Sequence, residues 1–303
     1  FERYMRIAYP HGKQDYHGRH HHRPPRSACG LRKYRGGLAL ESEHRTRTVA
    51  DTQLPDHIVN GDFEYPGGQA WMKLPGTEDW AGISRKDGKI YAAVPGKWVA
   101  YPGLDAARFA WDSTETGYGI PGASGSAGQL HTNEVEVQLD RGTNNTYAEL
   151  CAHQAGTAIY QDIATTPGVM YKISLKHTSQ SKMHADGMQV LVGPPGRETA
   201  VEMTRTADQN GLNKVGEQGT TIVTKASNEG YIEGAGSRYH DGQWATYEGT
   251  YLATGTVTRF TFKSISSYLP DFGNLLDDIS FEKAYPLSYD MNGGTGGPKQ
   301  KNY

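Results

Sequence analysis

Three polar side chains alternate with valines in residues 134–138, which read EVEVQ. Successive side chains of a β-strand point to opposite faces, so Glu134, Glu136 and Gln138 are predicted to share one face. Glycoside hydrolysis needs a pair of carboxyl groups, one of which gives up and regains a proton. Gln138 cannot transfer a proton in this way, so the segment predicts ligand binding by Glu134 and Glu136 without catalysis. The chain is therefore not expected to be an enzyme.

Residues 71–118 hold four of the five tryptophans of the chain. Aromatic faces stack on sugar rings while polar groups bind the hydroxyls, although cores use the same aromatic side chains. His177, His184 and Asp186 flank a predicted hairpin and are candidates for the same concave face, in either a structural or a ligand-hydrogen-bonding role. Trp80 and Trp111 are the first candidates for a stacking platform. The predicted ligand-binding residues are Trp80, Trp98, Tyr101, Trp111, Glu134, Glu136, His177 and Asp186, with Trp71 and Tyr118 in the same loops.

Short runs of strand-forming residues, separated by turns rich in Gly and Pro, extend over most of the chain. In residues 169–176 apolar and mostly polar side chains alternate, so one face is expected to pack on a second sheet. The pattern predicts an all-β fold, an antiparallel β-sandwich (jelly roll) with long loops. Residues 194–218 are predicted to be mixed loop. The predicted strands are residues 58–64, 89–94, 98–101, 134–139, 147–153, 158–163, 169–177, 188–192, 220–225, 243–251, 256–264 and 275–282.

Charge is unevenly distributed along the 303 residues. Residues 1–50 contain 11 Lys and Arg against 4 Asp and Glu, so they carry +7 and the remainder −9 of the net charge of −2. A basic, His-rich segment could bind nucleic acid or a metal, but without a strand pattern residues 1–53 are predicted to be a disordered leader. No nucleic-acid partner and no membrane span are expected. Cys29 and Cys151 permit either a bridge or two free thiols.

Two motifs lie at the ends of the predicted sandwich, NGDFE at residues 60–64 and GNLLDDI at residues 273–279. Between them, YAEL at 147–150 and YQDI at 160–163 fit the same pattern. On these motifs, residues 55–284 resemble the carbohydrate-binding-module-like jelly rolls of the galactose-binding-like superfamily. The resemblance implies a domain at residues 54–284 that binds an oligosaccharide or a glycoprotein glycan.

The same resemblance implies a structural calcium ion, because the first and last strands of such jelly rolls lie close together and often hold one. Ca²⁺ is bound by carboxylate and carbonyl oxygens. Glu64 and one of Asp277 or Asp278 would supply carboxylates, and Gly61 or Asp62 a carbonyl. Adjacent strand residues point to opposite faces, so only one of the two C-terminal aspartates is expected to use its side chain. The alternative is that these residues are solvated at strand ends.

Residues 285–303 contain YDMNGGTGGP, which is similar to the opening of an internalin-type B repeat of Gram-positive surface proteins. This resemblance implies a truncated B-repeat module in an extracellular, cell-wall-anchored protein, with its other modules as further partners. The expected function is non-catalytic glycan binding by a bacterial surface adhesin. One alternative is a structural stalk that displays other modules without binding a ligand. A weaker alternative is a jelly-roll glycoside hydrolase or lyase, since laminarinase-type enzymes place carboxylates in the pattern of residues 134–138.

Overall fold

The computed structural model describes part of the chain, and every described residue belongs to the second of two compact units, residues 51–303. The predicted B-repeat start and nearly all of the predicted leader lie outside the described residues. So do Trp71, Tyr101 and Tyr118 and the side chain of Trp98. The described ranges are residues 53–67, 80–94, 97–100, 103–116, 132–140, 142–152, 154–227, 231–232, 237–238, 240–269 and 272–285.

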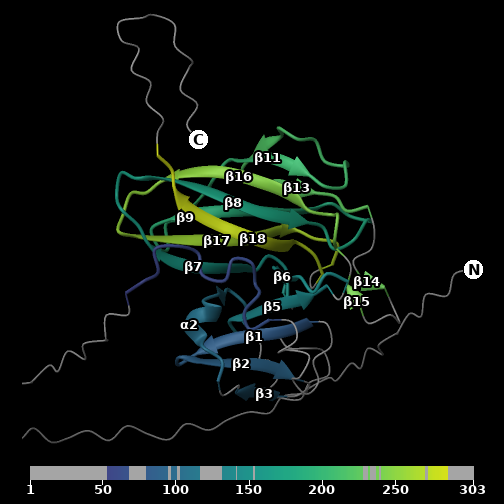
Figure 1. The fold of residues 1–303 in the computed structure, drawn as a ribbon, viewed down its shortest axis with the longest axis horizontal. Coiled ribbons are helices and arrows are strands. Elements are labelled where there is room, and N and C mark those ends of the chain that lie inside the picture. Colours follow the sequence, from purple (N-terminus) through teal and green to yellow (C-terminus); the bar gives the residue numbers. More distant parts are fainter. Residues whose placement is uncertain are drawn as a thin grey trace, which may run out of the picture. The chain divides into compact units, whose positions relative to one another are not determined.

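Ten strands form the larger of two antiparallel sheets, in the order β12-β11-β16-β8-β18-β6-β5-β1-β2-β3 (Figure 1). The last described strand in sequence, β18, therefore lies in the interior of this sheet, between β8 and β6. The strands are β1 Trp80–Lys86, β2 Lys89–Val94, β3 Lys97–Ala100, β5 Glu134–Leu139, β6 Thr146–Glu149, β8 Met170–Thr178, β11 Met203–Asp208, β12 Gln218–Gly219, β16 Ala245–Leu252 and β18 Leu275–Lys283.

The smaller sheet follows the order β10-β9-β17-β7-β4, and β13 also pairs with β9. A separate two-stranded ladder joins β14 to β15. The strands are β4 Asp112–Ser113, β7 Ala158–Ala164, β9 Asp186–Gly193, β10 Thr199–Ala200, β13 Ile222–Thr224, β14 Tyr231–Ile232, β15 Ser237–Arg238 and β17 Val257–Ser266.

The two sheets share one hydrophobic core, because alternate side chains of both point inward. From the larger sheet this core takes Val135, Val137, Ile173, Leu175 and Leu276, among others. From the smaller sheet it takes Ile159, Ile163, Met188, Val190, Val192, Phe260 and Phe262. The prediction of an all-β antiparallel sandwich is confirmed.

Most predicted strands are present with ends shifted by a few residues, and two predictions are wrong. Residues 58–64 form turns and irregular backbone instead of a first strand, with positive φ angles of 54° at Asn60 and 52° at Phe63. Residues 194–218 include β11, which pairs with β16, so this segment is more regular than predicted. The strand β1 was not predicted at all.

The segment before β1 is held against β18 by the backbone, since the Ile279 amide donates to the Gly61 carbonyl at 2.9 Å. The short helix α2 (Ala106–Phe109) is capped by Asp105, whose carboxylate accepts from the Ala107 amide. Its Phe109 side chain is fully buried in the core. Within the described ranges, no helix has the length and apolar character needed to cross a bilayer.

Candidate functional site

The predicted row on β5 has formed, and it extends onto the neighbouring strands. Glu136 pairs with Gly82 of β1 on one side and with Glu149 of β6 on the other. Glu134 lies over Gly82 so closely that a Cβ built on this glycine would be 1.5 Å from Glu134 Oε1. Because Val135 and Val137 enter the core, this row faces away from the smaller sheet.

Gln138 holds two of these carboxylates together. Its Nε2 donates to Glu136 Oε1 at 2.9 Å and also to Glu149 Oε2. Glu149 Oε1 accepts from the Gly273 amide at 2.6 Å. Glu136 and Glu149 are only 6% and 2% exposed. The sequence prediction assigned Glu134 and Glu136 to ligand contact, but both are buried. Through Gln138, Glu136 and Glu149 are joined, and Glu149 connects β6 to the loop before β18.

Two aromatic residues flank Gln138 in the sheet, because Trp80 of β1 and Tyr147 of β6 are its register partners. Tyr147 packs edge-to-face on Trp244, with ring centroids 5.4 Å apart, and belongs to a small second hydrophobic cluster with Trp244 and Leu275. Trp80 is half-buried. Trp80 therefore lies beside the acidic row in the sheet, and its predicted role as a stacking platform stays a prediction.

Trp111 contradicts the expectation of an exposed platform. Its side chain is fully buried and stacks on Phe63, with ring centroids 5.2 Å apart. Phe262 of the smaller sheet meets it edge-on at 5.9 Å, and its Nε1 donates to the Asn60 carbonyl at 2.8 Å. Trp111 therefore belongs to the core, where it anchors the irregular segment that replaces the predicted first strand.

His177 and Asp186 also point inward, which corrects their predicted place on a ligand-binding face. His177 Nε2 donates to Asn274 Oδ1 at 2.9 Å, and its Nδ1 accepts from the Thr224 hydroxyl at 2.7 Å. Asp186 Oδ2 accepts from the Asn274 amide at 3.1 Å. Both side chains are fully buried, and burial lowers the pKa of His177 to about 4. A neutral histidine thus bridges the two sheets.

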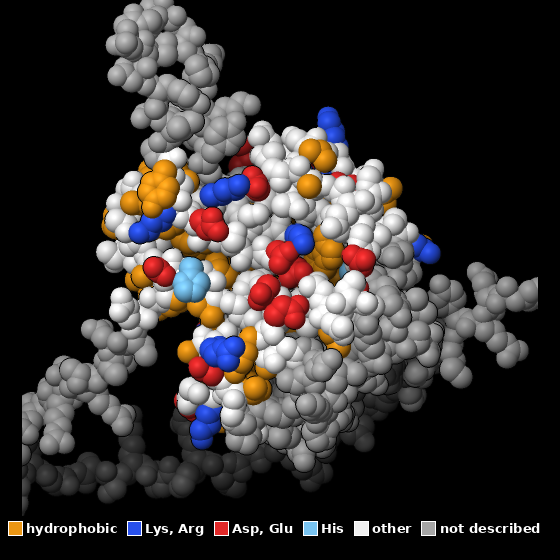
Figure 2. Space-filling view, in the orientation of Figure 1, with side chains coloured by type: hydrophobic (Ala, Val, Ile, Leu, Met, Phe, Trp, Pro, Cys, Tyr) orange, Lys and Arg blue, Asp and Glu red, His pale blue; other side chains and the backbone are white. Residues whose placement is uncertain are grey.

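The residues predicted to hold calcium lie around the start of β6. The amide of Thr146 donates to Glu64 Oε1 at 2.8 Å. Asn145, the residue before it, donates from Nδ2 to Asp277 Oδ2 at 2.9 Å. Figure 2 shows acidic side chains grouped near the middle of the displayed face, over the region where Figure 1 places β18 and β6.

The two adjacent aspartates of β18 behave differently, as predicted for neighbours in a strand. Asp278, with a φ of 47°, points outward and pairs with Lys176 at 2.6 Å. Asp277 is 2% exposed, and among the described residues its carboxylate has no ion-pair partner. Burial raises the pKa of Asp277 to about 7. Among the described residues, no three His, Cys, Asp or Glu side chains are grouped so that they could hold a metal ion, so a cation here would have to use carbonyl oxygens as well as the Asp277 carboxylate.

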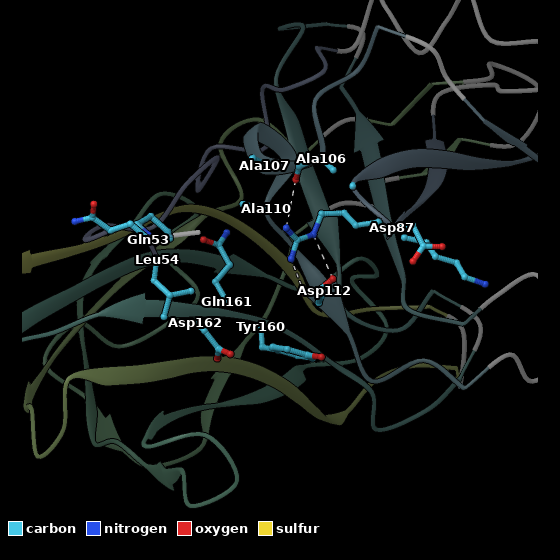
Figure 3. Close-up of a pocket in the computed structure, with 14 residues that line it drawn as sticks. Gln53, Leu54, Asp87, Ala106, Ala107, Ala110, Asp112, Tyr160, Gln161 and Asp162 are labelled. Carbon is cyan, nitrogen blue, oxygen red and sulfur yellow. Dashed lines mark hydrogen bonds and ion pairs between the residues drawn. The ribbon is translucent and has the colours of Figure 1, made fainter. Parts of the chain in front are cut away.

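A groove of about 540 Å³ opens elsewhere, between the β1–β2 turn, α2 and the outer face of β7. Its volume falls within the range of small-molecule sites. Figure 3 shows Gln53 and Leu54 at one end, Asp87 at the other, and Tyr160 and Asp162 along one wall. The sequence prediction named none of its lining residues.

Arg85 and Asp112 form the back of this groove. The Arg85 guanidinium donates to both Asp112 oxygens, and also to the carbonyls of Trp111 and Ala106 at 3.1 and 3.3 Å. Asn133 Nδ2 donates to Asp112 Oδ1 at 2.9 Å. Arg85 lies on β1 and Asp112 on β4, and the two bonds between them together with the Asn133 bond orient the carboxylate before any ligand arrives.

Tyr160 lies between two such ion pairs. It pairs in register with Asp112, and Arg259 lies 4.3 Å from its ring centroid. Arg259 donates to the two Asp162 oxygens at 2.6 and 2.8 Å. Burial, followed by the charge of Asp112, raises the pKa of the Tyr160 phenol. Its hydroxyl therefore stays protonated at neutral pH, and it makes no hydrogen bond within the described part of the chain.

Some of these placements could have been read from the sequence. His177 follows Leu175 by two residues and Asp186 precedes Met188 by two, so strand alternation already puts both on the apolar face. The position of Glu149 beside Glu136 could not be read from the sequence, because it depends on the register between β6 and β5. The Arg85–Asp112 ion pair could not be read either, because it joins residues far apart in the chain.

Comparison with known proteins yields no sequence family, since no family and no curated protein matches the chain. Solved structures do match. A family 35 carbohydrate-binding module from Clostridium thermocellum has 12% identity and a TM-score of 0.28, covering 48% of this chain and 83% of its own. A family 61 module in complex with β-1,4-galactotriose has 10% identity and a TM-score of 0.28, covering 75% and 97%.

An adhesin domain of Lys-gingipain from Porphyromonas gingivalis also matches, with 14% identity and a TM-score of 0.26, covering 67% of this chain and 90% of that one. TM-scores below 0.5 carry no inference about ligand or partner. The chain is an all-β sandwich with structural similarity to carbohydrate-binding modules and adhesin domains.

Proposed function

We propose that this chain is a non-catalytic glycan-binding module of an extracellular, cell-wall-anchored bacterial protein, and that the groove in Figure 3 holds the glycan. The observation that carries the proposal is the Tyr160 hydroxyl, which has no hydrogen-bond partner among the described residues and lies between two carboxylates held in place by arginines. Sugars are recognised by a few fixed polar groups around an apolar surface, and this groove offers both.

Each wall of the groove has a separate role in this proposal. Asp112 and Asp162 keep lone pairs beyond those used by their arginines, and these can accept hydrogen bonds from sugar hydroxyls. The Tyr160 hydroxyl can donate to or accept from a ring or hydroxyl oxygen. Ala106, Ala107 and Ala110 supply the apolar wall opposite Tyr160 (Figure 3).

The non-catalytic part of the proposal rests on the acidic row. A glycosidase must bring both carboxyl groups to the scissile bond, with room for substrate and water. Glu136 and Glu149 are almost fully buried, and both accept from the same Gln138 nitrogen. In this proposal Glu136 and Glu149 have a structural role, accepting hydrogen bonds that join neighbouring strands. The hydrolase alternative would need an exposed pair of acidic side chains, and the described residues of β5 and β6 contain none.

Replacing Tyr160 with phenylalanine is expected to weaken glycan binding about 2- to 12-fold, because one hydrogen bond of roughly 0.5–1.5 kcal/mol is lost while the ring remains. The full 303-residue chain should be titrated calorimetrically with soluble β-1,4-galactan, β-1,4-xylan, β-glucan and N-acetyllactosamine oligomers. Reducing-end release in the same samples measures turnover, and none is expected.

Tyr251→Phe provides the matched control, since Tyr251 lies on β16 and its buried hydroxyl has no hydrogen-bond partner within the described part of the chain. This variant should bind as the original chain does. Failure of the original chain to bind any glycan would overturn the proposal and favour the display-domain alternative. Binding that is unchanged in both variants would remove the groove as the site.

We also propose that Asp277 and Glu64, with the Gly61 carbonyl, hold a structural Ca²⁺ ion. The support is the Asp277 carboxylate itself, which is 2% exposed and whose pKa is raised by burial to about 7. An ion at this position would join the segment before β1 to β18, and ligation by the ionised carboxylate would stabilise the folded state.

Without calcium, the free energy of unfolding is expected to fall as pH rises from about 4 to about 7. In this window the folded state retains the Asp277 proton that the unfolded chain has lost, because the pKa is about 7 against an ordinary 3.8. Each pKa unit of difference between the folded and the unfolded state corresponds to about 1.4 kcal/mol of unfolding free energy. The lowered pKa of His177 makes the free energy of unfolding rise with pH over part of the same window. The contribution of Asp277 is therefore measured as the difference in free energy of unfolding between the original chain and Asp277→Asn, by urea titration at each pH.

Added Ca²⁺ should raise the melting temperature at neutral pH, and Asp277→Asn should abolish this response. The neighbouring Asp278→Asn is the control, because Asp278 points to solvent and pairs with Lys176. It should keep both the pH dependence and the calcium response. A chain whose melting is indifferent to chelator and to calcium would refute the ion site.

A further inference from the structure

The two arginines around the groove are already neutralised by internal carboxylates. Arg85 uses its donors on Asp112 and on two backbone carbonyls, with only 26% of its side chain exposed. Arg259 is paired in the same two-point manner with Asp162, and Glu198 lies 3.8 Å from its Nε. An incoming carboxylate or sulfate would have to displace one of these internal carboxylates, and breaking a partly buried pair is costly.

The remaining charges do not favour an anion either. Lys86, the last residue of β1, and Asp87, in the β1–β2 turn, are exposed neighbours of opposite sign. Together, the side chains that line the groove carry two positive charges, on Arg85 and Lys86, and three negative charges, on Asp87, Asp112 and Asp162. The walls thus offer more carboxylate acceptors than cationic donors that are not already paired. This balance suits a ligand that donates hydrogen bonds from hydroxyl groups and carries no negative charge.

On this basis we propose that the groove selects neutral saccharides and rejects uronic-acid and sulfated glycans. This inference rests on the proposed function and specifies its ligand class. The selecting elements are the Arg85–Asp112 and Arg259–Asp162 pairs, which turn each arginine away from ligand charge and leave a carboxylate facing the groove. Selectivity therefore comes from internal ion pairing, and removing one internal carboxylate should release a cation for an acidic sugar.

The experiment compares matched glycans on the full chain: β-1,4-linked neutral oligomers and the same backbones oxidised at C6 to uronic acids or sulfated. The original chain is expected to bind the neutral member at least tenfold more tightly than its acidic counterpart. Asp112→Asn, which leaves Arg85 without its carboxylate, should narrow or reverse this ratio by weakening neutral binding and strengthening uronate binding. Asp162→Asn should act in the same direction through Arg259.

Glu282→Gln serves as the control for a lost negative charge, since Glu282 is an exposed carboxylate on β18 that does not line the groove. It should leave the ratio unchanged, and melting curves verify that each variant folds. Equal or tighter binding of uronates by the original chain would overturn the selectivity while leaving glycan binding intact. A ratio that Asp112→Asn and Asp162→Asn both leave unchanged would also overturn it. Absence of binding to every glycan would overturn both the selectivity and the proposed function.

Discussion

Replacing Trp111 with alanine is expected to destabilise the domain by about 3–5 kcal/mol, the range for removing a large aromatic side chain from a core. The side chain is fully buried between Phe63 and Phe262. Its loss would also leave the Asn60 carbonyl without the indole donor at 2.8 Å. Urea unfolding followed by far-UV circular dichroism gives the free energy of unfolding directly.

Tyr285→Ala tests whether the effect is specific to burial, because this aromatic is 83% exposed and should change stability by about 0.5 kcal/mol or less. A stable Trp111→Ala protein that had lost glycan binding would show that the sequence-based expectation of a sugar platform was right after all. A Trp111→Ala protein with a reduced free energy of unfolding, whose folded fraction still binds glycan, supports the core position.

Gly61→Ala is expected to cost on the order of 2–4 kcal/mol, although it adds a single methyl group. A Cβ at this position would lie 2.0 Å from the Ile279 carbonyl oxygen, which is backbone and cannot rotate away. The irregular segment around residue 61 would have to move away from β18, and the hydrogen bond from the Ile279 amide to the Gly61 carbonyl would lengthen or break. Thermal and urea unfolding would both detect the change.

Gly255→Ala is the matched substitution at a position with space. The nearest atom to its added Cβ would be the Val257 carbonyl oxygen at 3.5 Å, an ordinary contact. It should leave stability unchanged or raise it slightly, because alanine restricts the unfolded chain. Equal effects of the two substitutions would mean that the close approach of residue 61 to β18 is unimportant for folding.

Strands with regular alternation could be predicted from the sequence, and strands without it could not. β5 and β8 show alternating apolar residues over their length, and both were predicted close to their actual bounds. β1 reads WAGISRK, in which Gly82 interrupts the pattern because the Glu134 side chain lies over it. β11 reads MTRTAD, and its Arg205 is buried against Tyr247, which hydrophobic alternation does not anticipate.

The candidate site was less accessible to sequence reasoning, for a physical reason. Tryptophan is equally suited to a sugar platform and to a core, and only the packing of Phe63 and Phe262 decides the position of Trp111. The groove depends on Asp112 reaching both Arg85 and the register partner Tyr160, contacts that are distant in sequence. Local patterns contain no information about such pairs.

The interior position of β18 has a consequence for synthesis of the protein. While the chain emerges from the ribosome, the strands β12-β11-β16-β8 and β6-β5-β1-β2-β3 have no strand between them in the larger sheet until residues 275–283 arrive. Until then, both β8 and β6 present an open edge, and the Gly61 carbonyl lacks the Ile279 amide. The nascent domain therefore closes only in its final step, and translation that stalls before residue 275 would release a two-part, aggregation-prone intermediate.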